Sequence, residues 1–201
     1  MDEEKNIRAF LAIEPADEVL AAIARLQEKL RKEISGKISW TRPQGNHLTL
    51  KFFGSIDLAD VENISAAVKK QAAAAAPLVL KVEKMGVSPD LRKPRVLWVG
   101  IAGDSEKLIL LQNKLEADFE VLGFPRENRP FRAHLTLGRI KDARTAAGIE
   151  AAIKKHGNFT AGEFPVNELI LFQSKLTPQG AIYTKLETFP LGGINNNCLV
   201  F

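Results

Sequence analysis

HLTL stands at residues 47–50 of this chain and again at residues 134–137. The chain has three histidines, and two of them begin this tetrapeptide. In a β-strand successive side chains point to opposite faces, so the histidine and threonine of HLTL share one face and the leucines share the other. The leucines would anchor each strand in a core. Two such strands that meet across a cleft would bring two imidazoles and two hydroxyls together.

This set of side chains suits phosphoryl transfer without a metal ion. One imidazole takes a proton from water, and the other gives a proton to the leaving oxygen. Imidazole serves both purposes near neutral pH because its unperturbed pKa is about 6.5. Each threonine hydroxyl can donate a hydrogen bond to a phosphoryl oxygen, where charge builds in the transition state. The third histidine, His156, lies near the end of an expected helix, where a cationic side chain is favourable, so we leave it out of the site.

The composition predicts one compact domain over residues 1–201, built of two lobes. The chain has a mass of 22.1 kDa and is 45% hydrophobic, which is enough for a sizeable core. No apolar run approaches the roughly 20 residues that a membrane span needs, and the charged start of the sequence does not resemble a signal peptide. The single cysteine, Cys198, favours a reducing, cytoplasmic setting. We expect a cytoplasmic monomer with no membrane partner.

The basic charge of the chain is concentrated around the second HLTL. The whole chain has a formal net charge of +4. The segment from residue 126 to residue 144 alone reaches +4, because it holds two acidic residues, Glu127 and Asp142, and six basic ones: Arg126, Arg129, Arg132, Arg139, Lys141 and Arg144. Such a segment is either a solvated basic face or the binding surface of an anionic ligand near His134.

Hydrophobic periodicity and turn residues predict alternating strands and helices. We expect helices at residues 15–34, 57–76, 104–122 and 143–156. We expect strands at residues 7–14, 37–40, 47–54, 78–87, 95–102, 131–140 and 164–176, and a last one at 180–189, after a hairpin turn. The frequent hairpins favour an α+β fold of mainly antiparallel sheet. The order of elements recurs in each half, which indicates two related lobes.

Two H-x-T-x motifs, 87 positions apart, are typical of the 2H phosphoesterase superfamily. The flanking stretches GNHLTLKFFG, RVLWVG, RPFRAHLTLGRIK and GAIYTKLETFPL resemble the RNA 2′,3′-cyclic phosphodiesterases, also called the 2′-5′ RNA ligase family. The resemblance implies a bilobal α+β fold with two mainly antiparallel sheets, pseudo-twofold symmetry, outer helices and an active-site cleft between the lobes. It also implies hydrolysis of RNA 2′,3′-cyclic phosphate ends to 2′-phosphates without a metal or other cofactor, and a possible reverse activity as a 2′-5′ ligase.

The resemblance assigns roles that the two identical motifs cannot assign themselves. It implies that His47 is the proton donor and His134 the proton acceptor, with Thr49 and Thr136 on the phosphate. Many members have a proline before the second histidine, where this chain has Ala133. That replacement touches no reactive group.

Three basic residues near the motifs are further candidates for binding phosphate. The family often has an arginine at the position of Arg139. Strict alternation places Arg139 on the face opposite His134, but Gly138 would allow a bulge that re-aims it. Lys51 and Arg132 share the histidine face of their strands by the same alternation.

Six aromatic residues are candidates for stacking on a nucleobase, although core packing is the simpler explanation of each: Phe10, Phe52, Phe53, Trp98, Phe131 and Tyr183. Three other functions stay open. One is a 2H phosphoesterase that acts on a small cyclic nucleotide or an ADP-ribose cyclic phosphate. Another is an RNA-binding module without catalysis, although binding alone needs no pair of titrating histidines. The third, a metallohydrolase, lacks a cluster of ligands at the usual spacing.

Overall fold

The computed structural model describes residues 6–178 and 180–192, so Cys198 lies outside the described residues. The first half of the chain holds β1 (Asn6–Ile13), α1 (Asp17–Glu33), β2 (Ile38–Trp40), the 3₁₀ turn η1 (Pro43–Gly45), β3 (Leu48–Asp57), α2 (Leu58–Ala74) and β4 (Leu78–Ser88). The second half holds β5 (Val96–Gly103), α3 (Ser105–Val121), β6 (His134–Ile140), α4 (Ile149–His156), β7 (Thr160–Val166), β8 (Glu168–Thr177) and β9 (Gly180–Pro190). None of the described helices is long and apolar enough to cross a membrane.

The strands form two sheets in which every pairing is antiparallel, as expected for this α+β fold. The four-stranded sheet has the order β3-β1-β8-β9, and the five-stranded sheet has the order β2-β6-β5-β4-β7. Both sheets combine strands of the two halves, since β4 pairs with β5 and β8 pairs with β1. The β3-β1-β8-β9 and β6-β5-β4-β7 sets therefore correspond, with β2 added at one edge.

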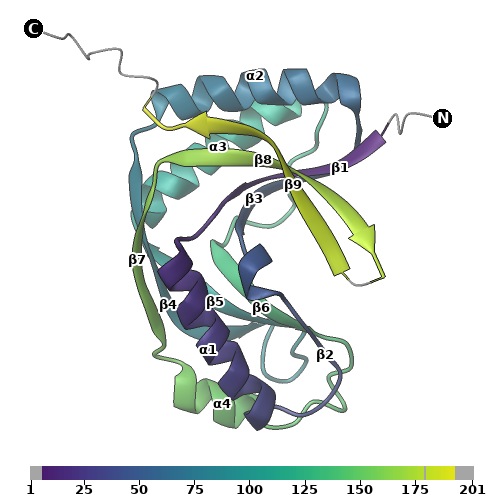
Figure 1. Ribbon diagram of the computed structural model, residues 1–201, viewed down its shortest axis with the longest axis vertical. Helices are drawn as coiled ribbons and strands as arrows, with labels where there is room; N and C mark the ends of the chain where they lie inside the picture. Colours follow the sequence, from purple (N-terminus) through teal and green to yellow (C-terminus); the bar gives the residue numbers. More distant parts are fainter. Residues whose placement is uncertain (1–5, 179, 193–201) are drawn as a thin grey trace, which may run out of the picture.

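The helices likewise pack against elements of the other half. Helix α1 follows β1 but packs beside β7 and α4, and α3 follows β5 but lies beside α2 (Figure 1). The face of α1 that carries Val19, Ile23, Leu26 and Leu30 is buried, as its helical spacing predicted. The backbone N–H of Asp57 donates to the Asp60 carboxylate at 3.3 Å, which satisfies a free donor at the start of α2.

Two elements differ from the expectation. Helix α4 begins at Ile149 rather than near residue 143, because Ala147 pairs with Ser35 and Gly148 follows in the left-handed region, with φ of 86°. A side chain at Gly148 would lie 2.3 Å from the Glu33 carbonyl oxygen, so only glycine fits there. The apolar run 164–176 breaks at Asn167, which ends β7 in one sheet and releases β8 to the other.

The main core lies between the sheets and their helices, but the four-stranded sheet also has a second apolar face. Phe10, Ala12, Ile170 and Phe172 form a small buried cluster on that face, opposite the main-core residues of β1. The chain passes from one sheet to the other through η1, which connects β2 to β3. His47 lies two residues after the end of η1 and therefore at this crossing.

Candidate functional site

His47 packs against the second apolar face of the four-stranded sheet. Its ring stacks on Phe10 with 4.5 Å between centroids, and Tyr183 meets it edge-on at 4.9 Å. The sequence placed His47 inside the strand, but it is a loop residue and β3 begins at Leu48. Burial lowers the pKa of His47 to about 4, although a hydrogen bond with the Gly45 backbone and the Glu14 charge act in the opposite direction.

His134 has a more open position at the start of β6, where it pairs with Gly100 and is exposed. Its Nδ1 donates a hydrogen bond to the Arg132 carbonyl oxygen at 2.7 Å. The neutral ring then has its free lone pair on Nε2, which is the acceptor that a general base needs. Both histidine rings thus bond to the backbone of the residue two positions earlier, Gly45 and Arg132.

A β-bulge follows the threonine in both motifs. In β3, Thr49 pairs with Ala12 and Lys51 with Leu11, so Leu50 is the extra residue. In β6, Thr136 pairs with Trp98 and Gly138 with Leu97, so Leu137 is the extra residue. After a bulge, the side chains of a strand point to the opposite face of the sheet from the one that strict alternation predicts. The two motifs therefore have the same sequence and also the same bulge, at their fourth residue.

The bulge in β6 brings Arg139 to the side of His134. Along this strand His134, Thr136 and Arg139 are accessible, whereas Leu135, Leu137 and Ile140 are buried. Strict alternation would have placed Arg139 on the buried face, and the bulge foreseen at Gly138 reverses that placement. The guanidinium can therefore approach an anion held near His134 and Thr136.

The bulge in β3 has the opposite effect on Lys51, and the prediction from alternation is wrong there. The Lys51 side chain is only 4% exposed, and its Nζ lies 3.0 Å from the Glu116 carboxylate on α3. It also donates to the Pro125 carbonyl oxygen at 2.6 Å. Lys51 therefore points into the core between β3 and α3 rather than toward a bound phosphate.

A groove of about 930 Å³ extends from His134 and Thr49 along the segment between α3 and β6. Arg126, Arg129 and Arg132 line it, and Trp98 and Ser88 form part of its wall. Arg126 is also paired with Glu120 at 2.8 Å. Lys141 and Arg144 do not line the groove, and Arg144 instead pairs with Asp142 at 3.1 Å. The basic segment thus contributes three arginines beside His134.

Two consecutive stretches of the chain, residues 13–98 and 99–183, each match the family described as LigT-like phosphoesterases. The chain belongs to this family. The first stretch contains His47 and the second contains His134 at nearly the same distance from its start, so the repeated tetrapeptide marks a repeat of the whole family unit. This repeat agrees with the correspondence between the two sheets.

Relatives of this LigT-like chain cover it almost completely. An RNA 2′,3′-cyclic phosphodiesterase of Methanothermobacter thermautotrophicus is 33% identical over 186 residues, which are 92% of this chain and 100% of that protein. One of Aquifex aeolicus is 33% identical over 94% of this chain and 100% of its own length. A crystal structure from Thermus thermophilus aligns with a TM-score of 0.77 at 29% identity, over 94% of this chain and 100% of that one. Escherichia coli LigT complexed with 3′-AMP aligns with a TM-score of 0.72 at 25% identity, over 92% and 98%.

The aromatic candidates of this LigT-like chain separate into two groups. Phe10 is fully buried beneath His47, and Phe53 packs on Phe119 and Phe124 in the main core, so packing explains both. Phe131 is partly buried against the main core and also lines the groove.

Three rings stay accessible near the motifs. Trp98 pairs across from Thr136, and its Nε1 donates to the Ser88 hydroxyl at 2.8 Å. Phe52 is 45% exposed, and Tyr183 is exposed beside His47. These three are the candidates for contact with a base.

The sequence reasoning missed a set of buried polar side chains that hold the two motifs. Gln27 and Gln112 are buried on α1 and α3, and each bonds to the backbone of an HLTL motif. Asn46, directly before His47, donates to the Thr136 carbonyl oxygen at 3.1 Å. A signal was present, because each glutamine lies among the core leucines of its helix, where a polar residue needs a partner. Among residues 6–178 and 180–192, no three His, Cys, Asp or Glu side chains gather as a metal would need.

Proposed function

We propose that this protein hydrolyses the 2′,3′-cyclic phosphate at an RNA end to a 2′-phosphomonoester by metal-independent acid–base catalysis. The observation that carries the proposal is the repeated site. Two His-Thr pairs on related strands each have the imidazole bonded to the backbone two residues earlier. The two relatives named above as RNA 2′,3′-cyclic phosphodiesterases support the same substrate.

In the proposed reaction, His134 acts as the general base and His47 as the general acid. The Nε2 of His134 takes a proton from water while the water oxygen bonds to phosphorus. The P–O3′ bond breaks on the opposite side, and His47 gives its proton to O3′. Thr49 and Thr136 donate hydrogen bonds to the non-bridging oxygens, and Arg139 offsets their negative charge. A 5′-hydroxyl in place of water would give a 2′–5′ linkage by the same steps.

His47 needs a proton for this role, although burial holds its pKa near 4 in the free protein. An anionic phosphate beside the ring favours the imidazolium and raises that pKa. The substrate therefore brings about the protonation that the reaction requires. Proton uptake on binding a 2′-phosphate product is measurable by calorimetry in buffers of different ionisation enthalpy.

The experiment that tests the function is replacement of each histidine. We expect His47→Ala and His134→Ala each to lower turnover of a cyclic-phosphate-ended RNA by about 10² to 10⁴. The double variant should lose less than the product of the two, because the histidines act as a unit. His156→Ala is the matched control, because His156 pairs with Glu33 on α1. Turnover close to wild type in either single variant would overturn the two-histidine mechanism.

The product identifies which histidine has which role. Phosphorus NMR separates a 2′-phosphate from a 3′-phosphate, and the proposed orientation gives the 2′-phosphate. A reversed ribose would exchange the roles of His47 and His134 and would leave a 3′-phosphate. A dominant 3′-phosphate therefore contradicts the assignment of acid and base but not the participation of both rings.

A further inference from the structure

The bulge residue of each motif accepts a hydrogen bond from a buried glutamine. The Nε2 of Gln27, on α1, donates to the Leu137 carbonyl oxygen at 2.7 Å. The Nε2 of Gln112, on α3, donates to the Leu50 carbonyl oxygen at 3.2 Å. Gln27 is 2% exposed and Gln112 is 4% exposed. Both bulges are thus held by an amide that is almost fully buried, although Gln112 also lines the groove.

The two hydrogen bonds are reciprocal between the halves of the molecule. Gln27 belongs to the first family repeat and holds the motif of the second, while Gln112 belongs to the second and holds the motif of the first. Their places in the repeats correspond, since Gln27 lies 20 residues before His47 and Gln112 lies 22 residues before His134. One glutamine per repeat therefore reaches across to the bulge of the other repeat.

Each glutamine is itself fixed by neighbours. Gln27 also donates to the Thr41 carbonyl oxygen at 3.0 Å, and the Thr41 hydroxyl donates to the Thr136 carbonyl oxygen at 2.6 Å. Gln112 lies 3.2 Å from the Glu116 carboxylate that pairs with Lys51. Because buried polar groups need their partners, these networks allow few alternative positions of the two bulges.

The bulges fix the backbone directly beside the reactive side chains. Upstream of each bulge lie a histidine and a threonine, and downstream of it the strand faces are exchanged. Loss of the glutamine donor would leave a buried carbonyl oxygen with one partner fewer, which favours a shift of the bulge. A displacement of about 1 Å at a reacting group can cost as much as 10²-fold in rate.

We propose that Gln27 and Gln112 are positioning residues, which aim His134 and His47 by holding the bulge of the opposite repeat. The kinetic part of this inference rests on the proposed function. Both amides donate to the backbone of a motif, including that of Gln112, which lines the groove, so the effect should appear mainly in kcat, with KM changed by less than about 3-fold.

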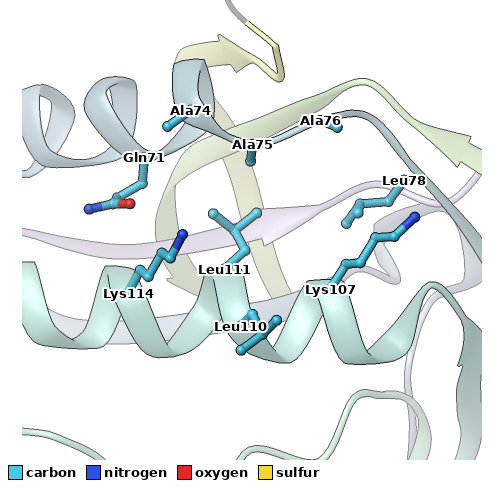
Figure 2. Close-up of a pocket in the computed structure, with 9 residues that line it drawn as sticks. All are labelled: Gln71, Ala74, Ala75, Ala76, Leu78, Lys107, Leu110, Leu111 and Lys114. Atoms are coloured by element: carbon cyan, nitrogen blue, oxygen red, sulfur yellow. The ribbon is translucent and has the colours of Figure 1, made fainter.

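The test uses Gln27→Met and Gln112→Met, which keep an unbranched side chain and remove the donor. Gln71→Met is the matched control. Gln71 is likewise a helix glutamine with a long-range hydrogen bond, since its Nε2 donates to Asp118 on α3 at 2.6 Å. It lies away from both motifs, beside Ala74 and Lys114 (Figure 2). Should a methionine variant fail to fold, the asparagine variant, whose amide is one methylene too short, takes its place.

Two readouts are compared below the melting temperature of each variant. We expect kcat to fall by roughly 10- to 100-fold in both test variants and to stay near wild type in Gln71→Met. The chain has three histidines, so their ring-proton NMR signals can be followed separately. Gln112→Met should move the His47 signal and Gln27→Met the His134 signal, with His156 as the fixed reference.

Unchanged kcat and unmoved signals in folded test variants would reduce both glutamines to structural residues. An equal fall of kcat in Gln71→Met would likewise overturn the proposal, because the loss would then reflect general stability. A wild-type protein without turnover of cyclic phosphates would overturn the proposed function instead. The NMR signals alone would then decide whether the glutamines position the rings.

Discussion

His47 and His134 begin the same tetrapeptide but have unlike surroundings. His47 is enclosed by the rings of Phe10, Phe172 and Tyr183, which come from strands β1, β8 and β9. His134 stands in solvent at the end of the groove, bonded to the Arg132 backbone. Identical local sequence thus gives two imidazoles in different environments, because long-range neighbours decide the burial of each.

The depressed pKa of His47 has a consequence for stability. In the unfolded chain the ring binds a proton near pH 6.5, whereas burial delays this to about pH 4 in the folded protein. Between these values protonation favours the unfolded state, so stability is present above pH 6.5 and is lost as the pH falls toward 4. This group alone should remove roughly 3 kcal/mol over that range.

Urea unfolding of wild type and His47→Gln at pH 7 and pH 4.5 measures this loss. We expect the wild type to lose more stability than the variant, since glutamine does not titrate. His156→Gln serves as the control for removal of a histidine elsewhere. The same pH dependence in wild type and His47→Gln would show that His47 is protonated in the folded state.

At the scale of elements, the sequence predicted the strands but not the bulges at which their side-chain alternation shifts. Gly138 gave a hint of the bulge in β6, and Arg139 lies on the accessible face as that bulge requires. No glycine adjoins Leu50, so nothing local predicted the bulge in β3, and Lys51 turned out to be buried. A bulge depends on the register of the partner strand and on donors such as Gln112, which local alternation does not contain.

The Lys51–Glu116 pair connects β3 to α3 and to the segment that leads into the groove. Removal of one member leaves a buried charge with fewer partners, so Lys51→Met and Glu116→Gln should each cost about 3–5 kcal/mol. The double variant should cost clearly less than the two single losses together. A double-mutant cycle by urea unfolding measures the coupling, and additive losses would contradict a coupled pair.

At the scale of the whole molecule, three arginines line the groove that leads to His134. If they contact phosphates, a cyclic-phosphate-ended oligonucleotide should bind more tightly than a mononucleotide and should weaken as salt rises. Arg129→Gln should reduce the slope of log affinity against log salt by about 0.7. Arg25→Gln, an exposed site on α1, is the control. Equal binding of both ligands and a flat salt response would favour a small cyclic nucleotide as the substrate.

Two imidazoles suffice for the proposed proton transfers, so turnover should not depend on a metal ion. We expect full activity after prolonged dialysis against EDTA, measured with the same cyclic-phosphate-ended RNA. Loss of turnover that one added divalent ion restores would place the protein among the metallohydrolases instead.

The sequence also predicted two related lobes of antiparallel sheet, but not their exchange of strands. The run 164–176 was expected to be a single strand, so its division at Asn167 into β7 and β8 in different sheets was missed. The break at Asn167 depends on which strand edges are vacant, namely β4 for β7 and β1 for β8. The sheet that each of these strands joins is therefore set by contacts in the folded molecule and not by the local sequence.

Because the sheets combine strands from both halves of the chain, the fold cannot be completed until late in synthesis on the ribosome. Strand β1 emerges among the first residues, yet one of its two neighbours, β8, follows some 160 residues later (Figure 1). Until then Phe10 has no Phe172 beside it, and the surroundings of His47 are incomplete. We propose that residues 1–201 are one folding unit, so a nascent chain that stops after Val166 should show no cooperative unfolding by circular dichroism. A sharp transition in that fragment would contradict the proposal, because it would mean that the five-stranded sheet, whose strands are all present, folds without β8 and β9.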